Sequence, residues 1–163
     1  NAGANASQGE VLLFLHADTR LPAAADALIQ RAILAGAAWG RFDVCIDGRA
    51  PLLRVVARLM NWRSRLTGIA TGDQAIFVRR DVFFAVGGYP ELPLMEDIAL
   101  SKRLKRCGRP ACLSERVITS GRRWERHGVW RTILLMWRLR ASYFLGADPQ
   151  RLAIRYGYRP PQR

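Results

Sequence analysis

The sequence predicts an α/β fold in which helices flank a mixed, mainly parallel sheet. The chain has 163 residues, which suits one domain, and half of them are hydrophobic, which is enough for a packed core. Residues Val11 to Leu15 form a short apolar run without alternation, as expected of a strand buried on both faces of a parallel sheet. Strand-like and helix-like segments then alternate along the chain, which favours α/β organisation.

Turn residues bound each expected element. Pro22 ends the first strand, Gly36 ends the helix that follows it, and Pro51 opens the next helix. Glu96 and Asp97 open a helix whose last turn is basic, which complements the helix dipole. Helices are expected over residues 23–34, 51–66, 80–86, 96–106 and 128–145, and strands over residues 11–15, 39–46, 75–78 and 117–119.

Two of these helices leave alternatives open. The helix over residues 51–66 carries Arg54, Arg58, Asn61 and Arg65 at helical spacing, which indicates either a solvated face or a basic face for a membrane or a phosphate group. The helix over residues 128–145 combines tryptophans with flanking arginines. It therefore either packs on the sheet with its arginines in water or lies at a membrane interface.

The charge balance is strongly basic, with a formal net charge of +13 and a pI near 11.2. A charge of this size points to nucleic acid, an anionic membrane surface or a phosphorylated substrate. From Arg116 onward the only carboxylates are Glu125 and Asp148, and nearly all of the excess is arginine. Arginine suits bidentate phosphate contacts, although genome composition also favours arginine over lysine.

The cysteine pattern and the chain ends bear on location. Cys45, Cys107 and Cys112 are odd in number and show no C-x-x-C spacing, so free thiols in a reducing cytoplasm are expected. No apolar stretch reaches the roughly 18 residues of a spanning helix. The chain opens on Asn1 with residues typical of the middle of a helix, which indicates a fragment.

Three groups of residues could carry chemistry. Asp18 follows the first apolar strand, where it either holds a divalent cation that bridges phosphate oxygens or caps the next helix. Glu96-Asp97 follows a loop with glycines and prolines, and is either a general base with its partner or a pair that stabilises the helix dipole. Arg122-Arg123-Trp124 suits a diphosphate or, through phosphate contacts and stacking, a nucleic acid.

The order of these groups resembles the GT-A inverting glycosyltransferases of family 2. The resemblance spans Asn1 to about Tyr156 and is closest to a subgroup linked by name to arsenosugar biosynthesis. Its matching segments are Leu13-Phe14-Leu15-His16-Ala17-Asp18-Thr19 at the D-x-D motif, Gly72-Asp73-Gln74-Ala75-Ile76-Phe77-Val78 and Gly87-Gly88-Tyr89 at the acceptor-side strand and loop, Glu96-Asp97 at the E-D pair, and Arg122-Arg123-Trp124 at a shortened Q-x-x-R-W.

The resemblance implies a Rossmann-like GT-A fold and metal-assisted sugar transfer, with inversion, from a nucleoside-diphosphate sugar to a hydroxyl. Residues 1–156 would form a partial domain that lacks the nucleotide-binding strands, with a tail over 157–163. Asp97 would be the catalytic base, Glu96 its partner, and Asp18 the ligand of Mg²⁺ or Mn²⁺. The donor diphosphate would meet His16, Arg122, Arg123 and Trp124, and the acceptor side would comprise Gly72, Asp73, Gln74, Gly87, Gly88 and Tyr89.

The sequence departs from the family pattern at two points. His16 stands where the D-x-D motif has its first Asp, and Ser120 and Gly121 precede the arginines where the family has the glutamine of Q-x-x-R-W. Two rival functions remain: a basic, non-enzymatic module that binds membrane or nucleic acid, and an inactive, truncated relative. Because no recognised nucleic-acid motif is present, no nucleic-acid partner is expected. A cytoplasmic protein in peripheral contact with an anionic membrane is expected instead.

Overall fold

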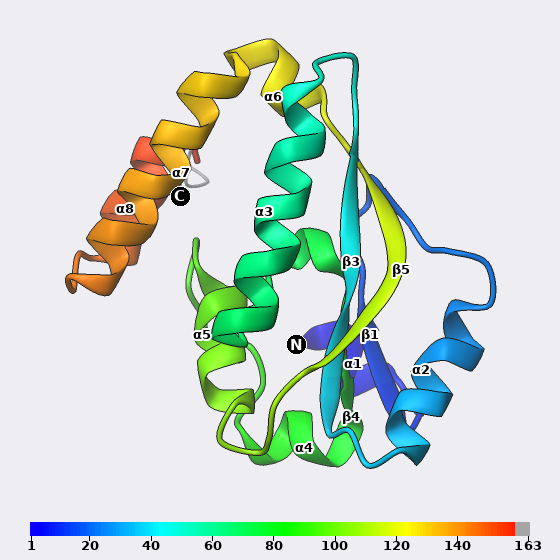
Figure 1. The fold of residues 1–163 in the computed structure, drawn as a ribbon. Coiled ribbons are helices and arrows are strands. Elements are labelled where there is room, and N and C mark those ends of the chain that lie inside the picture. The colour runs from blue at the N-terminus through cyan, green and yellow to red at the C-terminus, as the bar shows by residue number, and fades with distance from the viewer. Residues whose placement is uncertain (159–163) are drawn as a thin grey trace.

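The computed structural model describes residues 1–158 and has an α/β architecture (Figure 1). Five strands form one sheet in the order β1-β4-β3-β5-β2, and helices lie on its sides. The elements are α1 (Ala2–Ala6), β1 (Val11–Phe14), β2 (Thr19–Arg20), α2 (Ala25–Leu34), β3 (Trp39–Asp47), α3 (Leu52–Thr67), the 3₁₀ turn η1 (Gly72–Gln74), β4 (Ile76–Arg79), α4 (Arg80–Ala85), α5 (Glu96–Leu104), β5 (Ala111–Ser120), α6 (Arg122–His127), α7 (Val129–Phe144) and α8 (Pro149–Tyr156).

The α/β class is confirmed, but the expectation of a mainly parallel sheet is wrong. Among the described strands only β3 and β5 run parallel, while β4 is antiparallel to both β1 and β3, and β2 is antiparallel to β5. The first strand is also less buried than expected, since Leu12 is its one buried residue. An apolar run indicates that a strand is buried. It does not indicate whether the strand is parallel to its neighbours, which depends on the connections between strands.

The expected helices and the first three expected strands are present, with ends shifted by one or two residues in most cases. The strand expected over 117–119 is longer and covers Ala111–Ser120. Three further elements were not expected, namely β2, α6 and α8. Helix α6 begins at Arg122, so the Arg-Arg-Trp motif is helical, and the predicted tail lies outside the described residues from position 159 onward.

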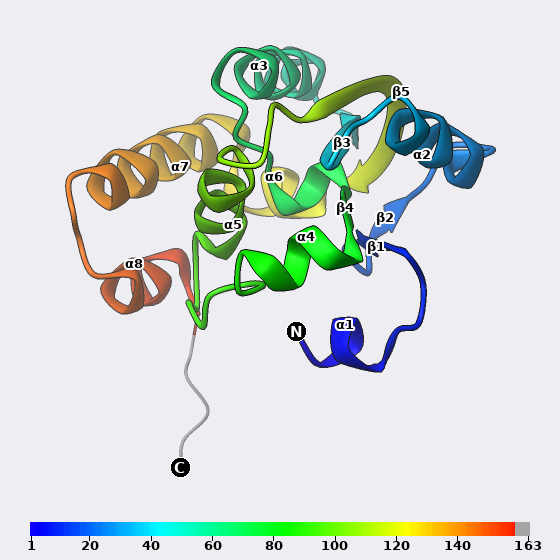
Figure 2. The same ribbon diagram turned by 90° about the horizontal axis from the view of Figure 1, so that it is seen from below.

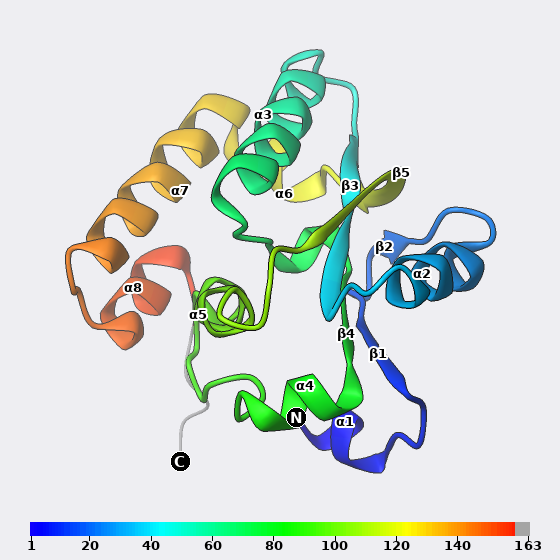
Figure 3. The ribbon, with the colours of Figure 1, turned by 60° about the horizontal axis from the view of Figure 1, so that its bottom comes forward.

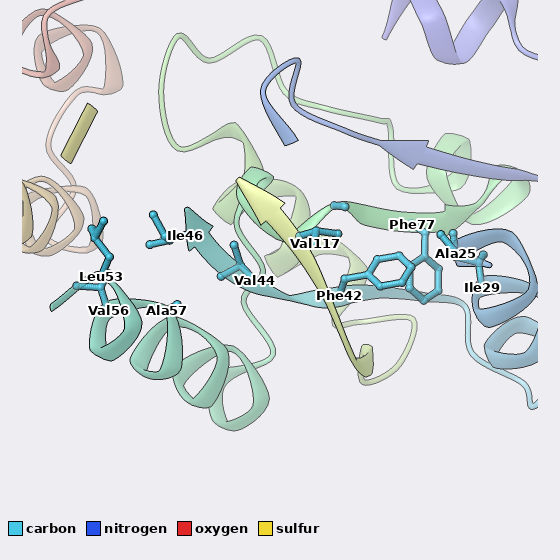
Figure 4. Close-up of a cluster of buried hydrophobic side chains, with 11 residues drawn as sticks. Ala25, Ile29, Phe42, Val44, Ile46, Leu53, Val56, Ala57, Phe77 and Val117 are labelled. Atoms are coloured by element: carbon cyan, nitrogen blue, oxygen red, sulfur yellow. The ribbon is translucent and has the colours of Figure 1, made fainter. Parts of the chain in front are cut away.

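The core centres on β3, which lies between α2 and α3 (Figure 3). Its alternate residues Phe42, Val44 and Ile46 point into a hydrophobic cluster, which is drawn in Figure 4. The other members of that cluster include Ala25 and Ile29 from α2, Leu53, Val56 and Ala57 from α3, and Phe77 and Val117 from β4 and β5. Burial of these side chains, at about 25 cal/mol per Å² of apolar surface, is what holds α2 and α3 against the sheet.

Polar groups also attach α3 to β3. The Asn61 side chain accepts a hydrogen bond from Val44 N (2.8 Å) and donates one to Val44 O (3.0 Å), so it replaces a neighbouring strand where β4 has ended. Asn61 therefore faces the sheet and does not belong to the polar stripe predicted for this helix. The fully buried Arg41 donates to Ser64 Oγ (3.0 Å) and to Asn61 O (3.1 Å), and it pairs with Asp43.

Helices α5, α7 and α8 form a second packed group, on the side of the molecule opposite α2 (Figure 2). The side chains buried together where these helices meet include Met95, Ile98, Leu139 and Leu152.

The three cysteines, Cys45, Cys107 and Cys112, are free thiols, as expected. Among residues 1–158, no helix is both long enough and apolar enough to cross a bilayer.

Candidate functional site

One cavity of about 450 Å³ collects most of the residues that the sequence singled out. Four carboxylates line it, from Asp18, Asp73, Glu96 and Asp97, together with the imidazole of His16. These groups come from the loop after β1, from η1 and from the start of α5. The opposite lining comes from Ser120 at the end of β5, from Arg123 and Trp124 in α6, from Thr132, Met136 and Arg140 in α7, and from Tyr156 at the end of α8.

The short helix η1 and the start of α5 hold the carboxylates in place. Gln74 is fully buried, and its Oε1 accepts a hydrogen bond from Thr71 N (3.2 Å), which closes the 3₁₀ turn. Next to these elements, Ala75 (φ 48°) and Met95 (φ 68°) adopt the left-handed conformation, which is uncommon for residues other than glycine. Backbone strain of this kind clusters at functional sites.

Asp97 is the most enclosed of the four carboxylates. Its Oδ2 accepts a hydrogen bond from Gly72 N (3.0 Å), and its Oδ1 accepts one from Ile98 N (2.7 Å). Burial raises the pKa of Asp97, and these two N–H groups and the charge of Arg140 oppose the shift. Burial also raises the pKa of Glu96, helped by the negative charge of Asp97. A carboxylate with a raised pKa is a stronger base than an exposed one.

His16 and Asp73 form a pair on the same wall. Their Nδ1 and Oδ1 atoms are 3.3 Å apart, and this hydrogen bond raises the pKa of His16 against the opposing effect of burial. Gly72 makes the approach possible, because a Cβ at this position would lie 2.2 Å from His16 Nε2. His16 thus contacts the Gly72-Asp73 turn from the loop after β1.

Asp18 lies on the cavity wall and is exposed. The alternative reading, in which Asp18 caps the next helix, is wrong, since the N-cap of α2 is Ala24 and no side chain caps it. No group of three or more His, Cys, Asp or Glu side chains within residues 1–158 is arranged to hold a metal. Asp18 fits a different kind of site, because Mg²⁺ is commonly bound by one or two carboxylates plus the phosphates of a ligand.

The basic motif is split by α6. Arg123 lines the cavity, donates to Tyr156 O (2.8 Å) and stacks its guanidinium 3.7 Å from the Tyr156 ring centre. Arg122 instead bonds Ser120 Oγ through Nε (3.1 Å) and does not line the cavity. Of the two arginines predicted to contact the diphosphate, Arg123 lines the cavity and Arg122 does not, because successive residues of a helix point in different directions.

The Gly87-Gly88-Tyr89 loop is also absent from the cavity lining. The ring of Tyr89 packs against Phe14, with ring centres 4.9 Å apart, and the Tyr89 backbone exchanges two hydrogen bonds with the Asn1 side chain. Gln74 likewise lies inside the core, where it bonds Asn61 Oδ1 (3.3 Å). Of the predicted acceptor-side residues, only Gly72 and Asp73 reach the cavity.

Arg140 is the charged residue of the cavity lining that sequence reasoning missed. It shares a face of α7 with Thr132 and Met136, at spacings of four residues, and all three line the cavity. The sequence pattern that could have identified it is an arginine at helical spacing on the inward face of an amphipathic helix.

Comparisons with models of known protein families, with curated proteins and with solved structures find no match to this chain, so the chemistry of the cavity is inferred from its own residues.

Proposed function

We propose that this chain is the metal- and acceptor-side part of an inverting glycosyltransferase similar to family 2. The observation that carries the proposal is that one cavity unites a half-buried carboxylate of raised pKa, an exposed carboxylate from the loop after β1 and a cationic wall. Sugar transfer from a nucleoside diphosphate needs all three, since a hydroxyl must lose a proton while a diphosphate leaves with its electron pair.

Each residue has a role in that reaction. Asp97 takes the proton of the acceptor hydroxyl, whose oxygen then forms the new bond to the anomeric carbon of the sugar. The bond from that carbon to the diphosphate breaks on the opposite face, which inverts the configuration. Arg123 binds the departing phosphate oxygens by charge-assisted hydrogen bonds. Asp18, with Asp73 nearby on the same wall, would hold a Mg²⁺ or Mn²⁺ ion, which supplies Lewis acidity to the diphosphate when it is bound.

Glu96 has a supporting role beside Asp97. It precedes Asp97 on α5, lines the same cavity and carries a raised pKa of its own. The negative charge of Asp97 helps to raise the pKa of Glu96, and two adjacent carboxylates of this kind titrate as a coupled pair. Glu96 also presents an oxygen to hydroxyl groups of a bound sugar.

Nucleotide-sugar binding in the presence of Mn²⁺ tests this proposal. We expect Asp18→Asn, made in the protein together with any residues that precede Asn1, to weaken Mn²⁺-dependent binding at least about tenfold, because even partners of metal ligands are worth 10–100-fold in affinity. Isothermal titration calorimetry with and without Mn²⁺ measures the change. The matched control is Asp26→Asn, an exposed carboxylate on α2, which should leave binding unchanged. Equal affinities for Asp18→Asn and the wild type would refute the metal role, and no binding by either would favour an inactive relative.

A further inference from the structure

Two arginines near the cavity lack the partners that buried cations usually have. Arg140 on α7 lines the cavity, and Arg63 on α3 lies close enough for the two positive charges to repel. The buried Nε of Arg140 and the buried Nε and Nη2 of Arg63 have no hydrogen-bond partner among residues 1–158. Within the same residues, neither guanidinium takes part in an ion pair.

Arg41 shows what a buried arginine with a purely structural role looks like in this protein. It is fully buried, and it is matched by Asp43, Ser64 and Asn61. Within residues 1–158, Arg63 makes a single long hydrogen bond, from Nη1 to Ile69 O (3.3 Å). Arg41 therefore has hydrogen-bond and ion-pair partners for its guanidinium, whereas buried donors of Arg63 and Arg140 have none among residues 1–158.

This arrangement disfavours the charged form of both side chains and so lowers their pKa values. Burial lowers the pKa of Arg63 to about 10, and the positive charge of Arg140 contributes to the shift. Burial likewise lowers the pKa of Arg140, although Asp97 and Asp73 partly offset it. Desolvated cations that repel each other are stabilised by an anion that accepts their free donors.

We propose that Arg140, supported by the charge of Arg63, binds a phosphate group of the ligand on the α7 wall of the cavity. A phosphate dianion matches two guanidinium charges, and its oxygens match the fork of donors that arginine presents. Arg140 contacts the phosphate directly, because it lines the cavity. Arg63 does not line the cavity and acts from the adjoining helix α3.

The position of Arg140 also indicates which substrate carries the phosphate. Arg140 is close enough to Asp97 for each to perturb the ionisation of the other. This step rests on the proposed function: the acceptor hydroxyl lies beside Asp97, so a phosphate at Arg140 belongs to the acceptor. The acceptor is then a phosphorylated molecule, and the donor diphosphate occupies the side of Arg123 and Asp18.

Binding of inorganic phosphate, followed by calorimetry or by backbone NMR shifts, tests the subsite without any transfer assay. We expect Arg140→Gln to weaken phosphate binding at least about tenfold, since charged hydrogen bonds contribute about 1.5–3 kcal/mol each. Arg151→Gln, which removes an exposed arginine of α8 that does not line the cavity, should leave the affinity unchanged. Arg140→Lys, which keeps the charge and loses the fork, should give an intermediate affinity.

The possible results distinguish the phosphate subsite, the assignment of that subsite to the acceptor, and the proposed function. No saturable phosphate binding, or an equal loss for Arg151→Gln and Arg140→Gln, would overturn the subsite. If a saturating nucleoside diphosphate displaces the phosphate, the subsite belongs to the donor, and the acceptor assignment is wrong. If phosphate and nucleoside diphosphate bind together, the acceptor assignment holds. A subsite that binds phosphate in a protein that transfers no sugar would leave this inference standing without the proposed function.

A separate observation concerns exposed apolar side chains on α3 and α7, two helices that are neighbours in Figures 1 and 3. On α3, four apolar side chains at spacings of three or four residues are between 46% and 63% exposed: Val55, Leu59, Trp62 and Leu66. On α7, four more are between 56% and 69% exposed: Trp130, Leu134, Trp137 and Phe144. We call these two rows the apolar stripes.

Charge complements the apolar stripes. Neither α3 nor α7 contains a single Asp or Glu. Exposed arginines accompany both rows, namely Arg54 and Arg58 on α3 and Arg131 and Arg138 on α7, whereas Arg65 is ion-paired with Asp43. Tryptophan and leucine on one side of a helix, with arginines beside them and no carboxylate, is the composition of helices that lie in the plane of an anionic bilayer surface.

We infer that the apolar stripes dock this protein on the surface of a membrane that contains anionic lipid. The tryptophan rings would enter the headgroup region, and the arginines would contact lipid phosphates while their aliphatic stems cover apolar surface. Such contact is peripheral and needs no spanning helix. It also accounts for part of the large positive charge of the chain.

Sedimentation with vesicles of phosphatidylcholine, with or without phosphatidylserine, tests this surface. We expect binding only when phosphatidylserine is present, and Trp62→Ser or Trp137→Ser to weaken it at least about tenfold, the value of one large buried apolar side chain. The control is Leu34→Ser, whose leucine is 89% exposed on α2, beyond β3 from the stripes. An effect of Leu34→Ser as large as that of Trp62→Ser would refute the surface. So would a wild-type protein that binds no vesicles, or one whose stripe variants only change its self-association.

Discussion

Replacing Asp97 by Asn is expected to lower the rate of sugar transfer by about 10²–10⁴-fold, which is the usual contribution of a positioned general base. Asn has nearly the same shape but cannot accept the proton of the acceptor hydroxyl. The hydrogen bond from Gly72 N can be kept by the amide oxygen, so the loop should stay in place. Rates of product formation, measured with saturating donor and Mn²⁺, give the comparison, and a variant that retains nearly the wild-type rate would show that Asp97 is not the base.

The fold of this variant should survive. Because burial raises the pKa of Asp97, the folded state favours its neutral form, and the free energy of unfolding due to this group increases as the pH falls through the folded pKa. Asn is neutral as well, but its NH2 group cannot accept the hydrogen bond from Ile98 N, so the loss of activity should come with a loss of stability of about 0.5–1.5 kcal/mol, the value of one hydrogen bond. Glu91→Gln, which neutralises an exposed carboxyl group in the preceding loop, is the control and should keep full activity.

The pH dependence of sugar transfer by the wild-type protein tests the same proposed role of Asp97. Below the pKa of Asp97 the base is protonated and inactive, so kcat/KM should fall as the pH decreases through that value. Since burial raises this pKa, the fall should begin at a higher pH than for an ordinary aspartate. The charge of Asp97 also raises the pKa of Glu96, so the acid limb should reflect both carboxylates.

Replacing Gly40 by Ala is expected to destabilise the protein by about 3 kcal/mol or more, at the upper end of what an overpacked core costs. Gly40 lies in β3 opposite Phe77 of β4 and Ala111 of β5. A Cβ at this position would lie 2.3 Å from Phe77 Cζ and 2.4 Å from the carbonyl oxygen of Ala111. The ring of Phe77 is itself packed in the core, and the backbone of β5 cannot move without breaking the one parallel pairing of the sheet.

Thermal unfolding measures this effect. For a chain of this length, 1 kcal/mol corresponds to about 2–4 °C in Tm, so Gly40→Ala should lower Tm by roughly 6–12 °C. The control is Gly3→Ala in α1, where no atom lies within 4 Å of the added carbon. It should leave Tm unchanged or raise it slightly, because alanine favours helix. An unchanged Tm for Gly40→Ala would contradict the close approach of β4 and β5 at this position.

The sequence by itself determined the local elements of this protein. Apolar periodicity and turn residues depend on neighbours a few positions away, so they located α2, α3, α5 and α7 to within about two residues. The same patterns assigned Asp18 and Glu96-Asp97 to a strand end and a helix start. Those positions are where ligand-binding side chains of α/β proteins often occur.

Only the tertiary structure decided strand direction and the membership of the cavity. Arg122 does not line the cavity because of its direction on α6, and Tyr89 does not line it because its ring packs against Phe14. Arg140 lines the cavity because α7 lies along it. The tertiary structure also created the contact of His16 with Asp73, beside a turn where a Cβ at position 72 would meet the His16 ring. Contacts of this kind join segments far apart in the chain, and their geometry depends on the packing of whole elements, which no local pattern of residues encodes.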